Sequence, residues 1–209
     1  MKVLVIGAGN MGAGFVKQLS AAGHSVSVTA RDAAKAASVA SQYANVQSVV
    51  AAGAAEGPDV VILATGYGDA VPALQSVGNL QDKVVIDITN PLTADYMGLT
   101  LGHSTSAAEE IAKAVPAAIV VKAFNTVLAQ VLDQGASLTD GSKVAVFYAG
   151  DNEAAKATVR TLAESLGFAT TDTGGLKNAR YLEPLAGLNI YFAYGAGRGT
   201  AIAPAWQGF

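Results

Sequence analysis

The chain of 209 residues contains no cysteine. Disulfide frameworks, thiolate metal sites and cysteine nucleophiles are therefore excluded. It has only two histidines, His24 and His103, which are too few for a metal cluster built from imidazoles. We expect no metal site.

Charge is also scarce. Charged residues make up 14% of the chain and apolar residues 51%, whereas disordered chains show the opposite balance. Thirteen basic residues stand against sixteen acidic ones, for a net charge of -3. This balance gives no basic surface for nucleic acid. We expect a folded protein that does not bind nucleic acid.

Long hydrophobic runs are missing as well. The longest apolar runs, such as 3–6, 60–64 and 117–121, are far shorter than the roughly 20 residues of a spanning helix. The first residues enter an apolar run directly, without the basic head and cleavage site of a signal peptide. We expect a soluble cytoplasmic protein without a membrane partner.

Short β-branched runs alternate with longer helical stretches along most of the chain. Helices are expected at 10–22, from about 32 to 43, with Asp32 as its cap, and from about 153 to 165. Strands alternating with helices predict an α/β fold with a doubly wound, mostly parallel sheet. The expected strands are 2–6, 25–29, 46–49, 60–64, 83–88, 119–123, 143–148 and 169–173.

The last part of the chain is less regular. Residues 176–192 look helical but apolar on several sides, with Pro184 in an early turn or at a kink. Such a segment must be buried, either against its own domain or against a second subunit. The glycine-rich tail ends with Trp206 and Phe209, and we expect it to be a loop that packs onto something. We expect a homodimer.

A glycine-rich turn follows the first strand, with the pattern G-x-G-x-x-G. Its first glycine permits a tight turn, the second lets backbone approach a pyrophosphate, and the third allows close helix packing. The following helix N-terminus offers amides and a positive dipole to phosphates. We predict a dinucleotide-binding turn rather than a turn without a ligand, formed by Gly7, Ala8, Gly9, Asn10, Met11 and Gly12.

The end of the second strand decides between the two nicotinamide cofactors. Arg31 stands first in the turn, and its guanidinium can form a bidentate contact with a 2′-phosphate. Lys35 follows one helical turn later with a second positive charge. We therefore predict NADP; the alternative is that Asp32 binds the ribose and both cations are solvated. The chain then divides into an NADP-binding Rossmann domain, 1–175, and a C-terminal helix and tail, 176–209, that serves packing or dimerisation.

Ligands of a doubly wound sheet lie beyond the carboxyl ends of the strands. Segments 64–68, 87–92 and 122–126 should meet there, although ordinary turn chemistry would also explain their composition. Asp87 is expected to be a buried structural acid, and Lys122 to face solvent or a cofactor phosphate, with a catalytic ammonium as the alternative. His103 is a candidate for substrate contact.

No nucleophile with a base and an orienting group stands out, so we predict no catalytic side chain. Hydride transfer between two cofactor rings mainly needs positioning, whereas reducing a carbonyl or imine needs a proton donor. The aromatic C-terminal segment, with Tyr191, Tyr194 and Trp206, favours a ring-shaped partner.

Several motifs resemble the F420-dependent NADP reductase family: VIGAGNMG at 5–12, Ala30-Arg31 with Lys35, and NARYLE at 178–183. ITNPL at 88–92 and VKAFNT at 121–126 add to this and are also similar to the oxidoreductase domain of STEAP-type metalloreductases. The resemblance covers essentially the whole chain. It implies a Rossmann domain with a small C-terminal segment, assembled as a dimer, that transfers a hydride between NADPH and a deazaflavin.

Carried over residue by residue, the resemblance implies that Ala8 to Met11 lie on the pyrophosphate and that Arg31 and Lys35 hold the 2′-phosphate. The residues that would border the nicotinamide are Ala64, Thr65, Ala123 and Asn125.

Two departures affect the second substrate. Gly66 and Tyr67 stand where deazaflavin-dependent members commonly have proline and a different aromatic residue, and Asn125 stands where some have histidine. The hydride acceptor is therefore F420, a flavin or another small molecule. Two alternatives stay open: reduction of a small imine or carbonyl compound, and a redox-sensing NADP-binding module without turnover.

Overall fold

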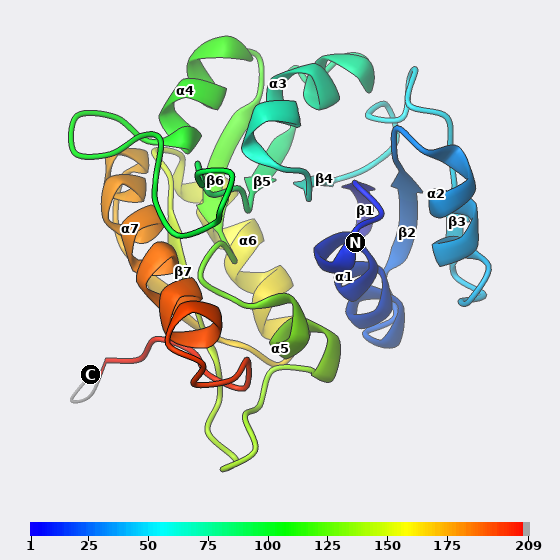
Figure 1. The fold of residues 1–209 in the computed structure, drawn as a ribbon. Coiled ribbons are helices and arrows are strands. Elements are labelled where there is room, and N and C mark those ends of the chain that lie inside the picture. Colours follow the sequence, from blue (N-terminus) through cyan, green and yellow to red (C-terminus); the bar gives the residue numbers. More distant parts are fainter. Residues whose placement is uncertain (207–209) are drawn as a thin grey trace.

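The computed structural model describes residues 1–206; Phe209, expected to close the packed tail, lies outside the described residues. An eight-stranded sheet with the order β3-β2-β1-β4-β5-β6-β7-β8 forms the centre of the molecule (Figure 1). Its strands are β1 Lys2–Ile6, β2 Ser25–Thr29, β3 Val46–Ser48, β4 Val60–Leu63, β5 Val84–Asp87, β6 Ile119–Ala123, β7 Ala145–Ala149 and β8 Ala169–Asp172.

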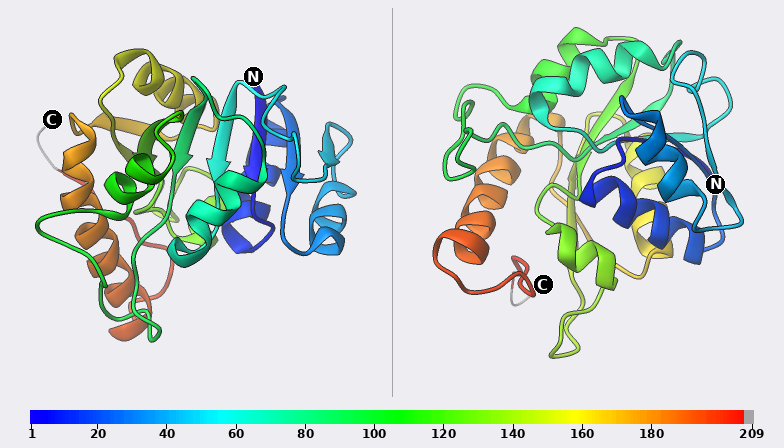
Figure 2. Two further views of the ribbon diagram at one scale, coloured as in Figure 1. Left: turned by 90° about the horizontal axis from the view of Figure 1, so that it is seen from above. Right: turned by 45° about the vertical axis from the view of Figure 1, so that its right-hand side comes forward.

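Helices cover both faces of this sheet (Figure 2). The predicted fold class, a doubly wound and mostly parallel sheet with a C-terminal helical segment, is confirmed. The α-helices are α1 Asn10–Ala21, α2 Ala33–Ala40, α3 Tyr67–Ser76, α4 Ala107–Ala114, α5 Ala129–Gln134, α6 Glu153–Ser165 and α7 Ala179–Ile190.

The side chains of β1 alternate between two buried cores, which explains why its sequence is a continuous apolar run. Val3 and Val5 belong to the core beneath α1, α5 and α6, whereas Leu4 and Ile6 belong to the core beneath α3 and α4. Successive side chains of a strand point to opposite faces, so a strand covered on both sides needs no polar residue.

One strand pairing departs from the parallel pattern. β6 and β7 are antiparallel, with Lys122 opposite Ala149 and Ala123 opposite Tyr148. The other strand pairs of the sheet are parallel. The carboxyl ends of β7 and β8 therefore point in the opposite direction from the carboxyl ends of β1, β4, β5 and β6.

Three helices were not predicted from the sequence: α3, α4 and α5. α3 contains Pro72, and α5 has only six residues, so their periodicity is weak. α4 did carry a signal, because Ser106 and Glu109 have the spacing of a capping box. The Ser106 hydroxyl oxygen accepts a hydrogen bond from the Glu109 amide at 3.2 Å.

The C-terminal segment forms a short 3₁₀ turn, Leu176–Asn178, then α7, and then a π-helical turn, Tyr191–Gly195. Pro184 lies inside α7. Leu182 and Ala186 are buried, and Trp206 packs edge-on against Phe147 with ring centroids 5.4 Å apart. Other apolar side chains of the segment are 43–74% exposed, namely Tyr181, Leu188, Tyr191, Phe192 and Tyr194.

A buried ion cluster connects α7 to the sheet. Lys122 Nζ lies 2.8 Å from Asp87 Oδ2 and 2.9 Å from Glu183 Oε1, and all three side chains are buried. The expectation that Lys122 faces solvent or a phosphate is wrong, because the two carboxylates and the Thr89 carbonyl, 2.6 Å away, surround its ammonium group. Asp87 is a buried structural acid, as expected.

Glu183 completes the connection. Its carboxylate accepts hydrogen bonds from the amides of Ala107 at 2.9 Å and Ala108 at 3.2 Å, at the start of α4. A negative group is favourable at a helix N-terminus. The cluster therefore joins β5, β6, α4 and α7. Separately, no helix within residues 1–206 has the length and apolar character needed to cross a bilayer.

We predict that Lys122→Met lowers the free energy of unfolding by about 3–5 kcal/mol, because it leaves two buried carboxylates without their cation. The measurement is chemical denaturation followed by circular dichroism. Lys17→Met is the matched control: Lys17 pairs with Asp133 at 3.0 Å on the surface, where such a pair contributes about 0–1 kcal/mol. Equal losses in the two variants would contradict the prediction.

Candidate functional site

The turn after β1 needs glycine at two positions for steric reasons. Gly7 has a φ of 120°, and a Cβ there would lie 2.3 Å from the Ala64 carbonyl oxygen. A Cβ on Gly12 would lie 2.0 Å from the carbonyl oxygen of Gly7. Both distances are shorter than any tolerated contact, so these two glycines let β1, β4 and α1 approach one another.

Gly9 is different, because a Cβ there would meet nothing within 4 Å. Gly9 is the N-cap of α1 and provides no side-chain acceptor, and the first turn of α1 contains no acidic residue. The amides of this turn therefore lack a nearby side-chain anion. Space above Gly9 and a positive helix end together fit a pyrophosphate. Gly9 and Asn10 are exposed, and Ala8 and Met11 are half-buried.

Arg31 lies between β2 and α2, and Lys35 lies in the first turn of α2. Arg31 is 89% exposed and contacts Asp69 on α3 at 3.3 Å. Asp32 is already used as a helix cap, since its Oδ1 accepts hydrogen bonds from the amides of Ala34 and Lys35. The cap orients the Asp32 carboxylate toward α2, which leaves Arg31 as the side chain available for a ribose substituent.

The segment after β4 lies directly beside the turn. The Ala64 amide donates to the Ile6 carbonyl at 2.8 Å, and Ala64 is the residue that excludes a side chain on Gly7. Thr65 is half-buried, and α3 begins two residues later at Tyr67. Ala64 and Thr65 therefore adjoin the proposed cofactor position.

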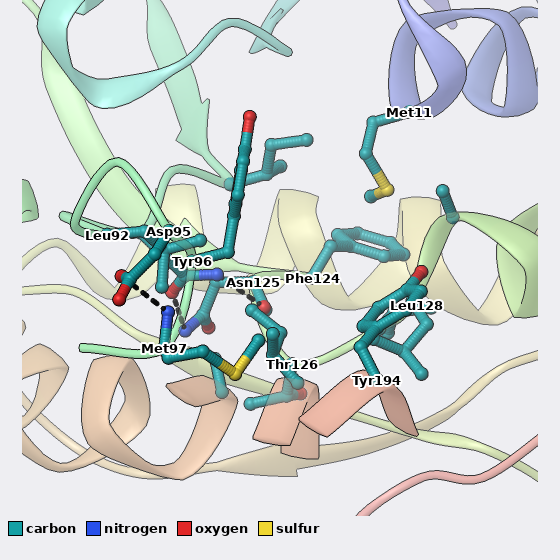
Figure 3. A pocket seen from close by; sticks show the side chains of 16 residues that line it. Met11, Leu92, Asp95, Tyr96, Met97, Phe124, Asn125, Thr126, Leu128 and Tyr194 are labelled. Carbon is teal, nitrogen blue, oxygen red and sulfur yellow. Dashed lines mark hydrogen bonds between the residues drawn. The ribbon is translucent and has the colours of Figure 1, made fainter. Parts of the chain in front are cut away.

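A cavity of about 540 Å³ opens beyond the carboxyl ends of β5 and β6. Figure 3 shows side chains from α1, the loop after β5, the β6–α5 segment and the C-terminal turn around one space. Its volume suits a small-molecule site. Its lining residues are Met11, Ile88, Asn90, Leu92, Asp95, Tyr96, Met97, Phe124, Asn125, Thr126, Val127, Leu128, Ala129, Ala186, Ile190 and Tyr194.

Phe124 makes one wall of this cavity rigid. Its φ is +60°, in the left-handed region that bulky residues rarely adopt. The ring packs edge-on between Phe15 and Phe168, with centroids 5.1 and 5.6 Å away. Such strain persists only where the surroundings hold the residue in place, and it is often found at binding sites. Ala123, the preceding residue, is fully buried.

Asn125 is held on both sides by hydrogen bonds. Its Nδ2 donates to Asn90 Oδ1 at 3.0 Å and to the Leu182 carbonyl at 2.9 Å. Among the described residues, its Oδ1 has no partner, and neither do the hydroxyl oxygens of Thr89 and Thr126. Buried acceptors without partners are rare in folded proteins. Asn125 Oδ1 and Thr126 Oγ1 are buried atoms of residues that line the cavity.

The structure brings most of the predicted site residues to one edge of the sheet. His103 is an exception, since it lies exposed in the loop before α4 and does not line the cavity. Leu92 lines the cavity and belongs to the predicted segment 87–92, whereas Asp95, Tyr96 and Met97 also line it but were missed by sequence reasoning. Their loop is placed by packing on the C-terminal segment, and no local motif indicates that contact.

The cavity carries little charge. Asp95 is the only lining residue, among those described, with a fully charged side chain at neutral pH. Hydrogen bonds from the Thr93 hydroxyl and the Met97 amide lower the pKa of Asp95. Burial raises the pKa of Tyr67, and the charges of Glu110, Glu183 and Asp87 raise it further. No cluster of three potential metal ligands occurs within residues 1–206.

Comparisons with known proteins agree with this geometry. The family model described as "NADP oxidoreductase coenzyme F420-dependent" matches residues 2–91. The F420-dependent NADP reductase of Methanothermobacter thermautotrophicus is 30% identical over 207 residues, covering 91% of this chain and 88% of that protein. Metalloreductase STEAP3 of Rattus norvegicus is 32% identical over 185 residues, covering 88% of this chain; the chain spans only 36% of that relative.

A solved structure gives the same result. A protein of Arthrobacter sp. FB24, proposed to be an F420-dependent NADP reductase, superposes with a TM-score of 0.85 and 30% identity. The superposition covers 99% of this chain and 100% of that one. The chain therefore belongs to the family of coenzyme F420-dependent NADP oxidoreductases.

Proposed function

We propose that this oxidoreductase transfers a hydride between NADP(H), bound at the glycine turn, and a planar ring compound of the flavin or deazaflavin (F420) type in the cavity. Met11 carries the proposal, because it belongs to the glycine turn and also lines the cavity. Two ligands bound at these adjoining places would have their reactive ends near Met11.

The protein's own part in the reaction is to bind, orient and exclude water. Bound NADPH supplies the hydride. Gly7 to Gly12 and the first turn of α1 would hold its pyrophosphate, and Arg31 and Lys35 its 2′-phosphate. Ala64, Thr65 and Asn125 would border the nicotinamide. The rigid Phe124 ring and the Asn90–Asn125 pair would keep the acceptor in position. Because both rings carry the chemistry, correct positioning would provide most of the rate enhancement.

A second candidate function rests on Tyr96. The Tyr96 phenol lines the cavity (Figure 3) and can act as a proton donor. Reduction of a small imine or carbonyl compound needs such a donor beside the nicotinamide.

We also propose that the chain is a cytoplasmic homodimer. The exposed aromatic and aliphatic side chains of α7 and the following turn form an apolar face that a second copy of the chain would cover.

We predict that Gly9→Ala weakens NADPH binding at least about tenfold, because the new methyl group occupies the space proposed for the pyrophosphate. The fold should lose about 1 kcal/mol or less, since no atom lies within 4 Å of that position. Titration calorimetry and thermal unfolding measure the two effects. Gly7→Ala is the contrasting variant and should lose at least about 2 kcal/mol of stability. Unchanged NADPH affinity in folded Gly9→Ala would refute the assigned phosphate position.

We predict that Arg31→Ala lowers NADPH affinity roughly 10- to 100-fold, as expected for a lost charge-assisted contact. NADH affinity should change less than about twofold, because NADH lacks the 2′-phosphate. Fluorescence titration with both cofactors measures the ratio. Arg160→Ala removes an exposed arginine from α6 and is the control. Equal affinities of the unmodified protein for NADPH and NADH would overturn the cofactor assignment.

We predict that the protein oxidises NADPH anaerobically with FMN, FAD or F420, measured by loss of nicotinamide absorbance. Tyr96→Phe should change this rate less than about threefold, because ring acceptors need no protein acid. Turnover only with imines or carbonyl compounds, and a loss of about 100-fold or more in Tyr96→Phe, would favour the second function. NADPH binding without turnover on any acceptor would favour a redox-sensing module.

A further inference from the structure

We propose that the cavity selects an uncharged ring compound as hydride acceptor and disfavours one whose ribityl side chain carries a phosphate. This inference rests on the proposed function and names the class of its second substrate. The balanced reaction moves one hydride, with its two electrons, from C4 of the nicotinamide of NADPH to the acceptor ring. A proton from water completes the reduced acceptor, and NADP⁺ is released.

The first observation is the composition of the cavity wall. None of the sixteen lining residues is lysine, arginine or histidine, and Asp95 contributes a negative charge. Asp95 is held in place, because its Oδ1 accepts hydrogen bonds from the Thr93 hydroxyl at 2.5 Å and the Met97 amide at 3.1 Å. Asp95 is exposed, so a phosphate beside its carboxylate would meet a repulsion that salt screens and that no lining cation offsets.

The second observation is that the cation nearest to the cavity along the chain is already neutralised. Lys122 precedes the lining residue Phe124 by two positions, but its ammonium group is buried between Asp87 and Glu183. Both carboxylates contact this one ammonium group, so it has no free face toward the cavity. Lys122 therefore offers nothing to an anionic acceptor.

The two arginines of the C-terminal segment do not line this cavity. Arg180 on α7 forms a two-point contact with Glu109, at 2.8 and 2.7 Å. Arg198 is exposed and lines a different cavity together with Leu185 and Leu188. Arg31 precedes α2 and Lys35 lies in its first turn, where the proposed 2′-phosphate would bind.

The third observation concerns neutral polar groups. Asn125 Oδ1 and Thr126 Oγ1 are buried and unpaired among the described residues, and both belong to residues that line the cavity. They are acceptors of the kind that suits the N–H and O–H donors of a neutral ring system and not a phosphate.

Riboflavin and FMN are the matched probes, because they share one ring and differ by a phosphate. At low salt we expect kcat/KM for NADPH oxidation by riboflavin to exceed that by FMN about fivefold or more, and the ratio to shrink at high salt. Asp95→Asn should bring the ratio toward one, and Asp95→Lys should reverse it. F420 and its ring-ribityl portion without the phosphate form a second matched pair, with the same expected order.

Asp140→Lys is the control variant. Asp140 is exposed and accepts hydrogen bonds from the hydroxyl and the amide of Ser142. Asp95 likewise accepts one hydroxyl and one amide hydrogen bond, but Asp140 does not line the cavity. This variant should keep the preference for riboflavin. NADPH affinity and thermal unfolding, measured for every variant, show that only the acceptor site has changed.

The outcomes are distinguishable. Equal rates in both matched pairs, faster reaction with the phosphorylated member, or an unchanged ratio in Asp95→Lys would overturn the inference while leaving the proposed function intact. NADPH binding without oxidation by any of the four acceptors would refute the proposed function itself.

Discussion

The contacts of Lys122 with Asp87 and Glu183 join the sheet, α4 and α7 beside the cavity. All three side chains are buried, and the Lys122 ammonium group contacts both carboxylates. Because Glu183 belongs to α7 and also caps α4, the cluster fixes the C-terminal helix against the end of the sheet. Lys122 also holds the Thr89 carbonyl, so the loop that leads into the cavity is positioned by the same cation.

Local sequence patterns determined much of the outcome. Strand, glycine turn and helix follow one another directly in the first βα unit, so the geometry of Gly7 and Gly12 could be anticipated from neighbouring residues. The cap formed by Asp32 is local as well. Short runs rich in β-branched residues indicated all eight strands, most clearly the central ones, which are buried on both faces and have few polar residues.

Long-range contacts were not predictable in the same way. Lys122 was misjudged because Glu183 is far away in the sequence, and nothing near Lys122 indicates that a carboxylate will cover it. The loop with Asp95 and Tyr96 is shaped by local hydrogen bonds among residues 93–98, but its position depends on distant contacts such as that of Met97 with Gly195. The reversal at β7 also depends on pairing between distant segments. A single sequence shows which residues suit such roles, but not which of them meet.

Met11 is the only cavity-lining residue that precedes Ile88 in the chain. In the proposed assignment, the phosphates of the dinucleotide are bound in the first third of the molecule, whereas the redox partner is bound by later residues, among which Asn125 would also border the nicotinamide. Selection can alter the later residues while the phosphate-binding turn stays unchanged. Such a division of labour allows one cofactor-binding scaffold to be matched with new oxidants through a few changes in a surface loop and a terminal helix, without rebuilding the nucleotide platform.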